Sequence, residues 1–191
     1  PQALTGLSSR ADLAQALAQR YGLPAGLTLA QAAQRVSRAG NRYHFTSFVL
    51  EALNSVGKAP AAMHQRLAAL VNKYHLKTII TTAYDDLLEQ ALRQFNVSFH
   101  TVINNSDIRF MQPDQLTLIK LYGTTNRPDS LVITEQDHTL LLRDQNRDEV
   151  LNEVRRTLAQ NSIYFLGYNL ADPDFASIRD HVATSRFART A

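Results

Sequence analysis

Cysteine is absent from this sequence, and no long hydrophobic run interrupts its mixture of apolar and polar residues. The lack of cysteine excludes disulfides, thiolate nucleophiles and cysteine-based zinc sites, and it fits a reducing, cytoplasmic location. No apolar stretch approaches the ~20 residues that a membrane-spanning helix needs, and no signal peptide is visible. Because the sequence begins at Pro1 rather than at methionine, we expect it to be part of a longer protein.

The composition is that of a globular domain with a core. The chain has 191 residues, of which 45% are hydrophobic and 19% are charged. Its net charge of +3 is not concentrated in a basic stripe, which argues against nucleic acid as a partner. The histidines lack the spacing of a metal-binding helix. The adjacent Asp85 and Asp86 supply too few oxygens for a cation site, so we predict no metal.

Residues 10–74 have the spacing of a helical region. Ser9 with Asp12, and Thr28 with Gln31, have the pattern of capping boxes at two helix starts. Gly22, with Pro24 two residues later, is typical of a left-handed helix end. Two further apolar stripes, over residues 45–53 and 63–71, predict two more helices that contribute to a core.

From residue 76 to 185 the pattern alternates between strands and helices. Short apolar runs predict strands at residues 78–82, 97–103, 116–122, 131–133 and 163–166. Helical spacing separates them at 87–95, at 134–142 and at 146–158, with Asn146 and Glu149 as the start of the last of these. Asp172 followed by Pro173 predicts a final helix. The alternation predicts an α/β, Rossmann-like fold, with a mostly parallel sheet covered by helices on both faces.

Ligands of such folds bind at the carboxyl ends of the strands, so the residues after each strand are the candidate site. The first of these corners reads TTAYDD, from Thr81 to Asp86. The second begins KLYG, with Gly123 directly after a strand, where a backbone can approach a ligand closely. The third reads GYNLADPDF and begins at Gly167.

These segments resemble the sirtuin-related domain of bacteria, which occurs in many defence proteins that cleave NAD. Its matching corners read TTNYD, KLHG followed by a segment similar to PxSLVIT and TExDY, and GYSLxDPD. Here they read TTAYDD, KLYGTTNRPDSLVITEQDH and GYNLADPDF. The helix at SSRADLAQALAQRYGLP also resembles the one that follows the family's glycine-rich loop.

The resemblance implies a single sirtuin-like domain over residues 1–191. Because it has no cysteine, the chain resembles the zinc-free branch of the family, whose members hydrolyse NAD to nicotinamide and an ADP-ribose product.

Two departures concern the catalytic positions that the resemblance implies. Ala83 stands where the family has an asparagine that orients the ribose and the attacking water. Tyr122 stands where the family has a histidine that acts as general base. Because a tyrosine with a pKa near ~10 is a poor base at neutral pH, no catalytic residue of the family is intact. Tyr84 follows the family pattern, and we expect it to pack under the corner.

The remaining matches predict a partial pocket for NAD or an ADP-ribose-like nucleotide. They are Thr81, Thr82, Asp85, Gly123, Gly167 and Asn169. Residues 1–9 contain only Gly6 and no preceding apolar strand, so we expect a fragment that lacks the first strand and the glycine-rich loop. Such a fragment could fail to bind NAD, and its exposed strand edge predicts a compensating contact such as a partner chain.

Two functions follow from these observations. The first is a degenerate sirtuin-like NAD-binding module, with a sensing, regulatory or assembly role among the fused domains of a larger bacterial defence protein, or in a homo-oligomer. The alternative is an active NAD hydrolase. In that case either Ala83 is an engineered inactivating substitution of asparagine, which leaves Tyr122 unexplained, or Asp85 or Asn104 supplies the missing groups.

Overall fold

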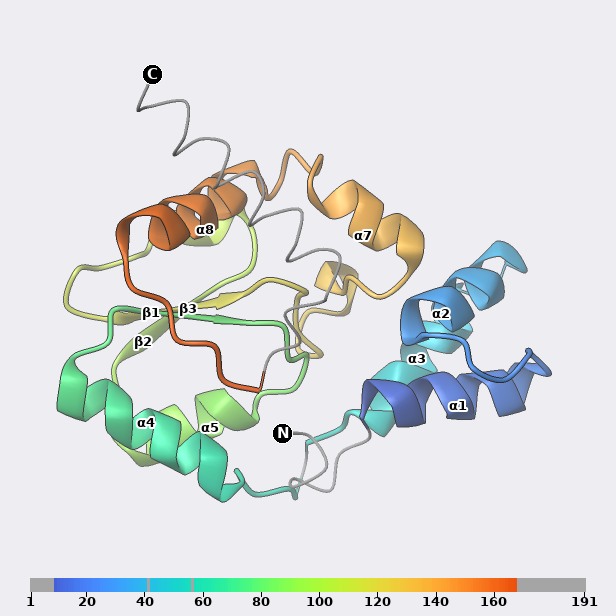
Figure 1. Cartoon of the computed structure of the whole chain (residues 1–191), viewed down its shortest axis with the longest axis horizontal. Coiled ribbons are helices and arrows are strands. Elements are labelled where there is room, and N and C mark those ends of the chain that lie inside the picture. Colours follow the sequence, from blue (N-terminus) through green and yellow to red (C-terminus); the bar gives the residue numbers. More distant parts are fainter. Residues whose placement is uncertain (1–8, 41, 56, 168–191) are drawn as a thin grey trace.

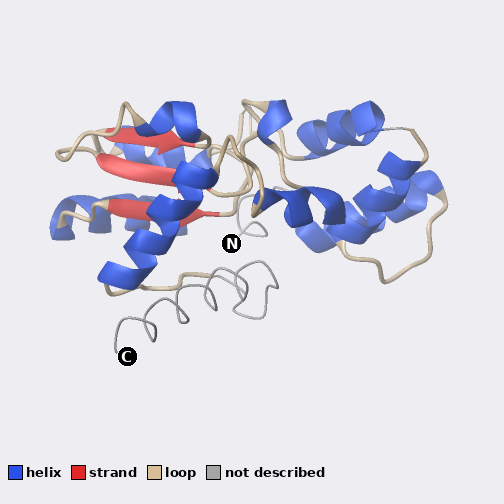
Figure 2. Ribbon diagram, turned by 90° about the horizontal axis from the view of Figure 1, so that it is seen from above, coloured by secondary structure: helices blue, strands red, loops and turns tan. Residues whose placement is uncertain are grey.

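The computed structural model describes residues 9–40, 42–55 and 57–167. Three helices, α1 (Arg10–Tyr21), α2 (Leu29–Arg38) and α3 (Arg42–Ala52), form a lobe at one end of the molecule. The other end is a sheet covered by helices (Figures 1 and 2). Helix α7 (Glu135–Leu141) contacts α2 and so links the helical lobe to the sheet half.

The sheet has three parallel strands in the order β1-β3-β2. They are β1 (Thr78–Thr81), β2 (Phe99–Val102) and β3 (Leu116–Lys120). Thr81 at the end of β1 pairs with Lys120, and Val102 at the end of β2 pairs with Ile119. The carboxyl ends of all three strands therefore lie at one edge, as the sequence predicts for a ligand site.

Helices cover both faces of the sheet, which confirms the predicted architecture. Leu116 and Leu118 of β3 pack with α4 (Ala62–Tyr74) and α5 (Leu87–Gln94) in one apolar cluster. Ile119, which points to the other face, belongs to a second cluster with Val150, Leu151 and Val154 of α8 (Asp148–Gln160). Because every residue of β3 is buried, this strand is the centre of the core.

The helical lobe follows its sequence signals closely. Both predicted capping boxes are present, since Ser9 accepts a hydrogen bond from Asp12 N and Thr28 accepts one from Gln31 N. Gly22 ends α1 with φ of 62°, the predicted left-handed cap. Leucine, alanine and phenylalanine side chains of α1, α2 and α3 fill the lobe and join the same cluster as α8.

Two predicted strands are wrong. Leu131–Ile133 follow a short 3₁₀ helix, Pro128–Ser130, and their side chains are buried, but they form no ladder. Val132 N donates a backbone hydrogen bond to Tyr122 O at 3.1 Å. Residues 163–166 also form no strand. Apolar character therefore marked burial rather than strand pairing at residues 131–133, whereas Tyr164, Phe165 and Leu166 are exposed.

The predicted start of α8 is also wrong. Arg147, not Asn146, is the N-cap residue, and α8 begins at Asp148. The Asn146 carbonyl accepts a hydrogen bond from Asn105 N at 2.8 Å instead. Asn105 opens an unpredicted short helix, α6 (Asn105–Ile108), after β2. The helix predicted from Asp172 lies outside the described residues.

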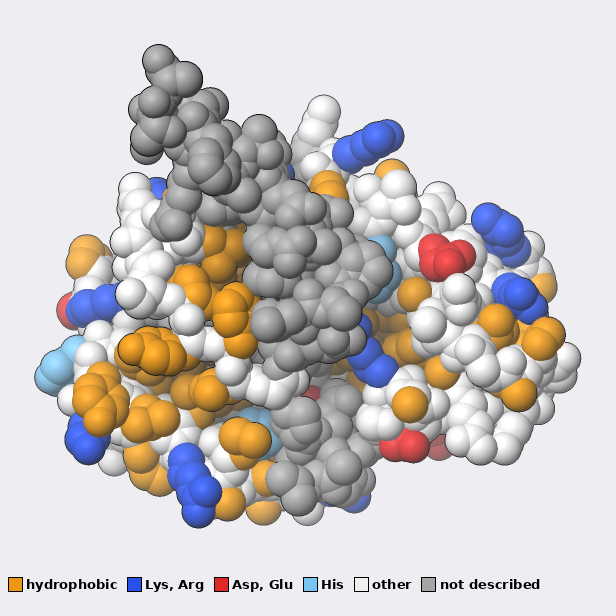
Figure 3. All heavy atoms as spheres, viewed as in Figure 1, with side chains coloured by type: hydrophobic (Ala, Val, Ile, Leu, Met, Phe, Trp, Pro, Cys, Tyr) orange, Lys and Arg blue, Asp and Glu red, His pale blue; other side chains and the backbone are white. Residues whose placement is uncertain are grey.

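No helix within the described residues has the length and apolar character needed to cross a membrane. Figure 3 shows lysine and arginine side chains scattered over the face that it presents, rather than gathered into one patch.

Candidate functional site

The first corner is held together by its own polar side chains. Thr81 Oγ1 accepts a hydrogen bond from Ala83 N at 3.1 Å. Asp85 is 5% exposed, and its Oδ1 accepts a hydrogen bond from Leu87 N at 3.1 Å, at the start of α5. Both predicted ligand-binding side chains thus have partners inside the corner. The half-buried Ala83 adds only a methyl group.

A buried ion pair lies beneath this corner. Lys120 Nζ at the end of β3 lies 2.7 Å from Glu89 Oε1 of α5, and the two side chains are 1% and 6% exposed. Lys120 Nζ also donates a hydrogen bond to the Asp85 carbonyl. The pair therefore connects the end of β3 to the backbone of the first corner. Among the described residues, Glu89 Oε2 has no hydrogen-bond partner, and the carboxylate contacts Lys120 through Oε1.

The first and second corners are also joined directly through their backbones. Leu121 N donates to Thr81 O at 2.9 Å, and Thr125 N donates to Tyr84 O at 2.9 Å. Tyr84 is buried and its hydroxyl donates to Val132 O at 2.8 Å, which confirms that it packs under the corner. The structure thus brings the residues predicted at these two strand ends together at one sheet edge.

Position 123 requires a glycine because of its backbone conformation and its close contact with Ser130. Its φ is 80°, and an added Cβ would lie 2.2 Å from the Ser130 carbonyl oxygen. The close approach that the sequence suggested for a ligand is therefore made to Ser130. Thr124 N reinforces the contact by donating to Ser130 Oγ at 3.1 Å.

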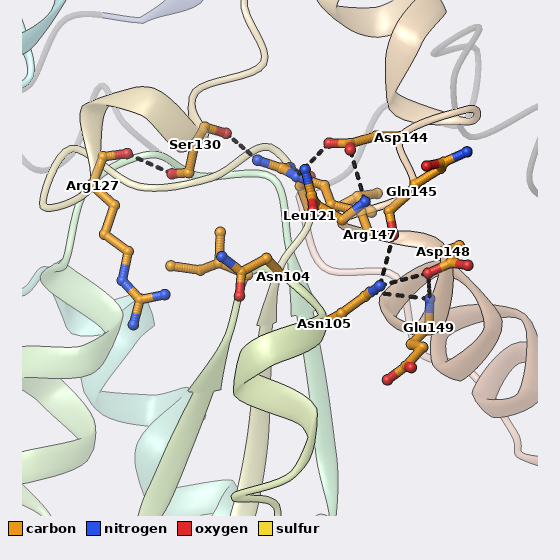
Figure 4. A network of polar contacts seen from close by, with 12 residues as sticks. Asn104, Asn105, Leu121, Arg127, Ser130, Asp144, Gln145, Arg147, Asp148 and Glu149 are labelled. Atoms are coloured by element: carbon orange, nitrogen blue, oxygen red, sulfur yellow. Dashed lines mark hydrogen bonds and ion pairs between the residues drawn. The ribbon is translucent and has the colours of Figure 1, made fainter.

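The side chain of Arg147 stabilises this second corner through hydrogen bonds to two of its carbonyl groups (Figure 4). Its guanidinium donates to Leu121 O at 3.1 Å and also to Ser130 O. Burial lowers the pKa of Arg147, and the Asp144 carboxylate, 3.6 Å away, offsets part of this effect. No local pattern marks Arg147 for this role, because its side chain reaches residues 17 and 26 positions earlier.

Tyr122, at the position of the family's histidine, is fully buried. Its ring meets the His138 ring at 88°, with 5.0 Å between centroids. The Arg10 guanidinium lies over the same ring, 5.0 Å from its centroid, and donates to the Tyr84 hydroxyl at 3.1 Å. A buried phenol packed between these groups is poorly placed to accept a proton from a ligand.

A cleft of about 680 Å³ opens beside these rings, between the helical lobe and α7. It is lined by Arg10, Ala11, Ala14, residues 26–31, Tyr84, Ile133, Glu135 and His138. Sequence reasoning missed Arg10 and His138. The one signal for His138 is that it stands where the similar family segment ends in tyrosine, and no local pattern marks Arg10.

The third corner is described only at its start. Gly167 is exposed, with φ of 62°, whereas Asn169 lies outside the described residues. Residues 162–166, which lead to this corner, line a second cavity of about 300 Å³ together with Thr81 and Thr82. The segment before the third corner therefore lies near the end of β1. Within residues 9–167, apart from 41 and 56, no group of three or more histidine and acidic side chains is placed to hold a metal ion.

Comparison with known proteins decides the family. The sequence model of the SIR2-like domain matches residues 77–189, which is more than half of the chain. The chain belongs to the SIR2-like domain family. It is also similar to Defense-associated sirtuin 2 of Bacillus subtilis, with 27% identity over 127 residues. That alignment covers 65% of this chain but 12% of the relative, so the chain spans about an eighth of the relative's length.

Proposed function

We propose that this SIR2-like domain binds NAD or an ADP-ribose-like nucleotide and turns NAD over poorly. The family generally binds NAD, and the cleft of about 680 Å³ falls in the size range of small-molecule sites. The domain would then have a sensing, regulatory or assembly role. Since the similar protein is named for defence and is much longer, we place this role in a larger defence protein.

The joint replacement at Ala83 and Tyr122 carries the proposal. Ala83 cannot orient a water molecule, and the fully buried Tyr122 packs against Arg10 and His138. Loss of one preorganised polar group typically lowers a rate by about 10²- to 10³-fold. Two losses in one site need not multiply, but together they should leave little turnover.

Neither residue considered for an active enzyme is well placed to replace these groups. The Asp85 carboxylate accepts a hydrogen bond from Leu87 N, at the start of α5. Asn104 Oδ1 accepts one from Ser106 Oγ at 2.7 Å. These contacts favour structural roles, and no specific observation favours the active hydrolase.

Restoring the family residues tests the proposal. We expect Ala83→Asn with Tyr122→His to raise NAD hydrolysis by at least about 100-fold over the unaltered chain, since each restored group acts on the transition state. The single variants and a nucleotide-binding assay serve as controls. Efficient NAD hydrolysis by the unaltered chain would contradict the proposal. So would a failure of both the unaltered chain and the double variant to bind NAD or ADP-ribose.

A further inference from the structure

Arg10, Tyr122 and His138 come from distant parts of the chain and meet beside the large cleft. Arg10 is the first residue of α1, Tyr122 follows β3, and His138 lies on α7. The guanidinium carbon of Arg10 and the ring of His138 each lie 5.0 Å from the centre of the Tyr122 ring. Since Arg10 and His138 also line the same cleft, one ligand can contact both.

Arg10 is held in a defined orientation at this place. Its guanidinium lies over Tyr122 and 5.5 Å from the centre of the Tyr84 ring, and it donates to the Tyr84 hydroxyl. These contacts restrict a side chain that would otherwise be flexible, which lowers the entropy lost when a ligand binds. A planar guanidinium with several N–H donors is well suited to phosphate oxygens.

Tyr122 and His138 differ in their exposure. Their rings pack edge to face, with 5.0 Å between the centroids. Tyr122 is buried, whereas His138 is half-buried and lines the cleft, so of these two rings the imidazole from α7 is the one that faces the cleft.

We propose that Arg10 and His138 together bind the phosphate groups of a nucleotide in this cleft. The inference rests on the proposed nucleotide-binding function and assigns the residues that recognise the ligand's anionic part. Glu135 is the one acidic side chain that lines the cleft in the described part of the chain, and it is exposed. Arg10 supplies a permanent positive charge, and the His138 ring supplies a hydrogen-bond donor.

Calorimetric titration with ADP-ribose tests the pair. We expect Arg10→Gln and His138→Gln each to weaken binding by about 10- to 100-fold, the range for hydrogen bonds to charged groups. Arg10→Lys should recover part of the loss, because it restores the charge without the planar fork. Arg20→Gln is the matched control, since Arg20 is an exposed arginine on the same helix. Thermal unfolding checks that each variant is folded.

A second readout does not depend on substitution of Arg10. The His138 ring resonance, assigned by its absence from the His138→Gln spectrum, should shift when ADP-ribose is added to the unaltered chain. The inference is wrong if ADP-ribose binds the unaltered chain, Arg10→Gln and His138→Gln with equal affinity, or if it binds without shifting this resonance. Absence of any binding to the unaltered chain would overturn both this inference and the proposed function.

Discussion

Lys120 is an unusual residue for the centre of a sheet, because its ammonium group is removed from water together with the Glu89 carboxylate. Taking two charges out of water costs several kcal/mol per ion, and their attraction and hydrogen bonds offset this cost. The pair ties β3 to α5 and, through the Asp85 carbonyl, to the first corner. Its contribution is to hold the two corners in position.

We predict that Lys120→Met lowers the free energy of unfolding by about 3–5 kcal/mol, because Glu89 is left as a buried, unpaired charge. The double variant Lys120→Met with Glu89→Leu should recover most of this loss. Arg156→Met, which breaks the surface pair of the exposed Arg156 with the half-buried Glu153, should cost less than about 1 kcal/mol. Urea unfolding measures all three. If Lys120→Met lowers the free energy of unfolding as little as Arg156→Met does, the buried pair does not stabilise the fold as we propose.

Gly123 supports a second prediction at the residue scale. Gly123→Ala should destabilise the chain for two reasons, the left-handed backbone and the clash of the new Cβ with Ser130 O. Gly40→Ala is a matched control, with φ of 84° and nothing within 4 Å of the new Cβ. The control should cost about 1–2 kcal/mol, and Gly123→Ala clearly more in the same unfolding experiment. If both variants lose the same free energy of unfolding, the backbone near Ser130 moves to accommodate the new Cβ at little cost.

At the scale of elements, the sequence predicted the helix ends that depend on neighbouring residues and missed features that depend on distant contacts. Capping boxes at Ser9 and Thr28 and the cap at Gly22 depend on residues a few positions apart, and all formed as predicted. The start of α8 was missed because Arg147 binds carbonyls far away in sequence. Leu131–Ile133 were read as a strand because a buried loop and a buried strand have the same apolar composition.

Helix α7 supports a prediction about acid stability. Burial raises the pKa of Asp137, but hydrogen bonds from Thr134 N and Ile133 N and the Arg42 guanidinium outweigh it and hold the pKa below its ordinary value of 3.8. A carboxyl group with a lowered folded-state pKa stabilises the protein above its unfolded-state pKa. This contribution is lost as the pH falls through the folded-state pKa.

We therefore predict that the free energy of unfolding falls as the pH drops below about 4. Asp137→Asn should be less stable at pH 7 and should lose less stability on acidification. Asp114→Asn, at an exposed position before β3, is the control and should follow the unaltered chain. Urea unfolding at a series of pH values tests this. The same pH dependence for Asp137→Asn and the unaltered chain would contradict it.

At the scale of the whole molecule, the candidate site belongs to both halves. The strand-end corners lie within the SIR2-like match at residues 77–189, and their motifs could be recognised in the sequence. The cleft is also lined by α1 and by residues 26–31 of the helical lobe, which lie outside that match. Arg10 reaches Tyr84 across 74 residues, a contact that no local pattern reveals.

The central claim is that this domain binds NAD without efficient turnover. We would mix the purified chain with NAD and follow the nicotinamide proton signals by NMR over several hours. The account predicts broadened or shifted NAD signals with little or no growth of free nicotinamide. Steady growth of free nicotinamide would contradict the claim of poor turnover, and NAD signals unchanged at high chain concentration would contradict the claim of binding.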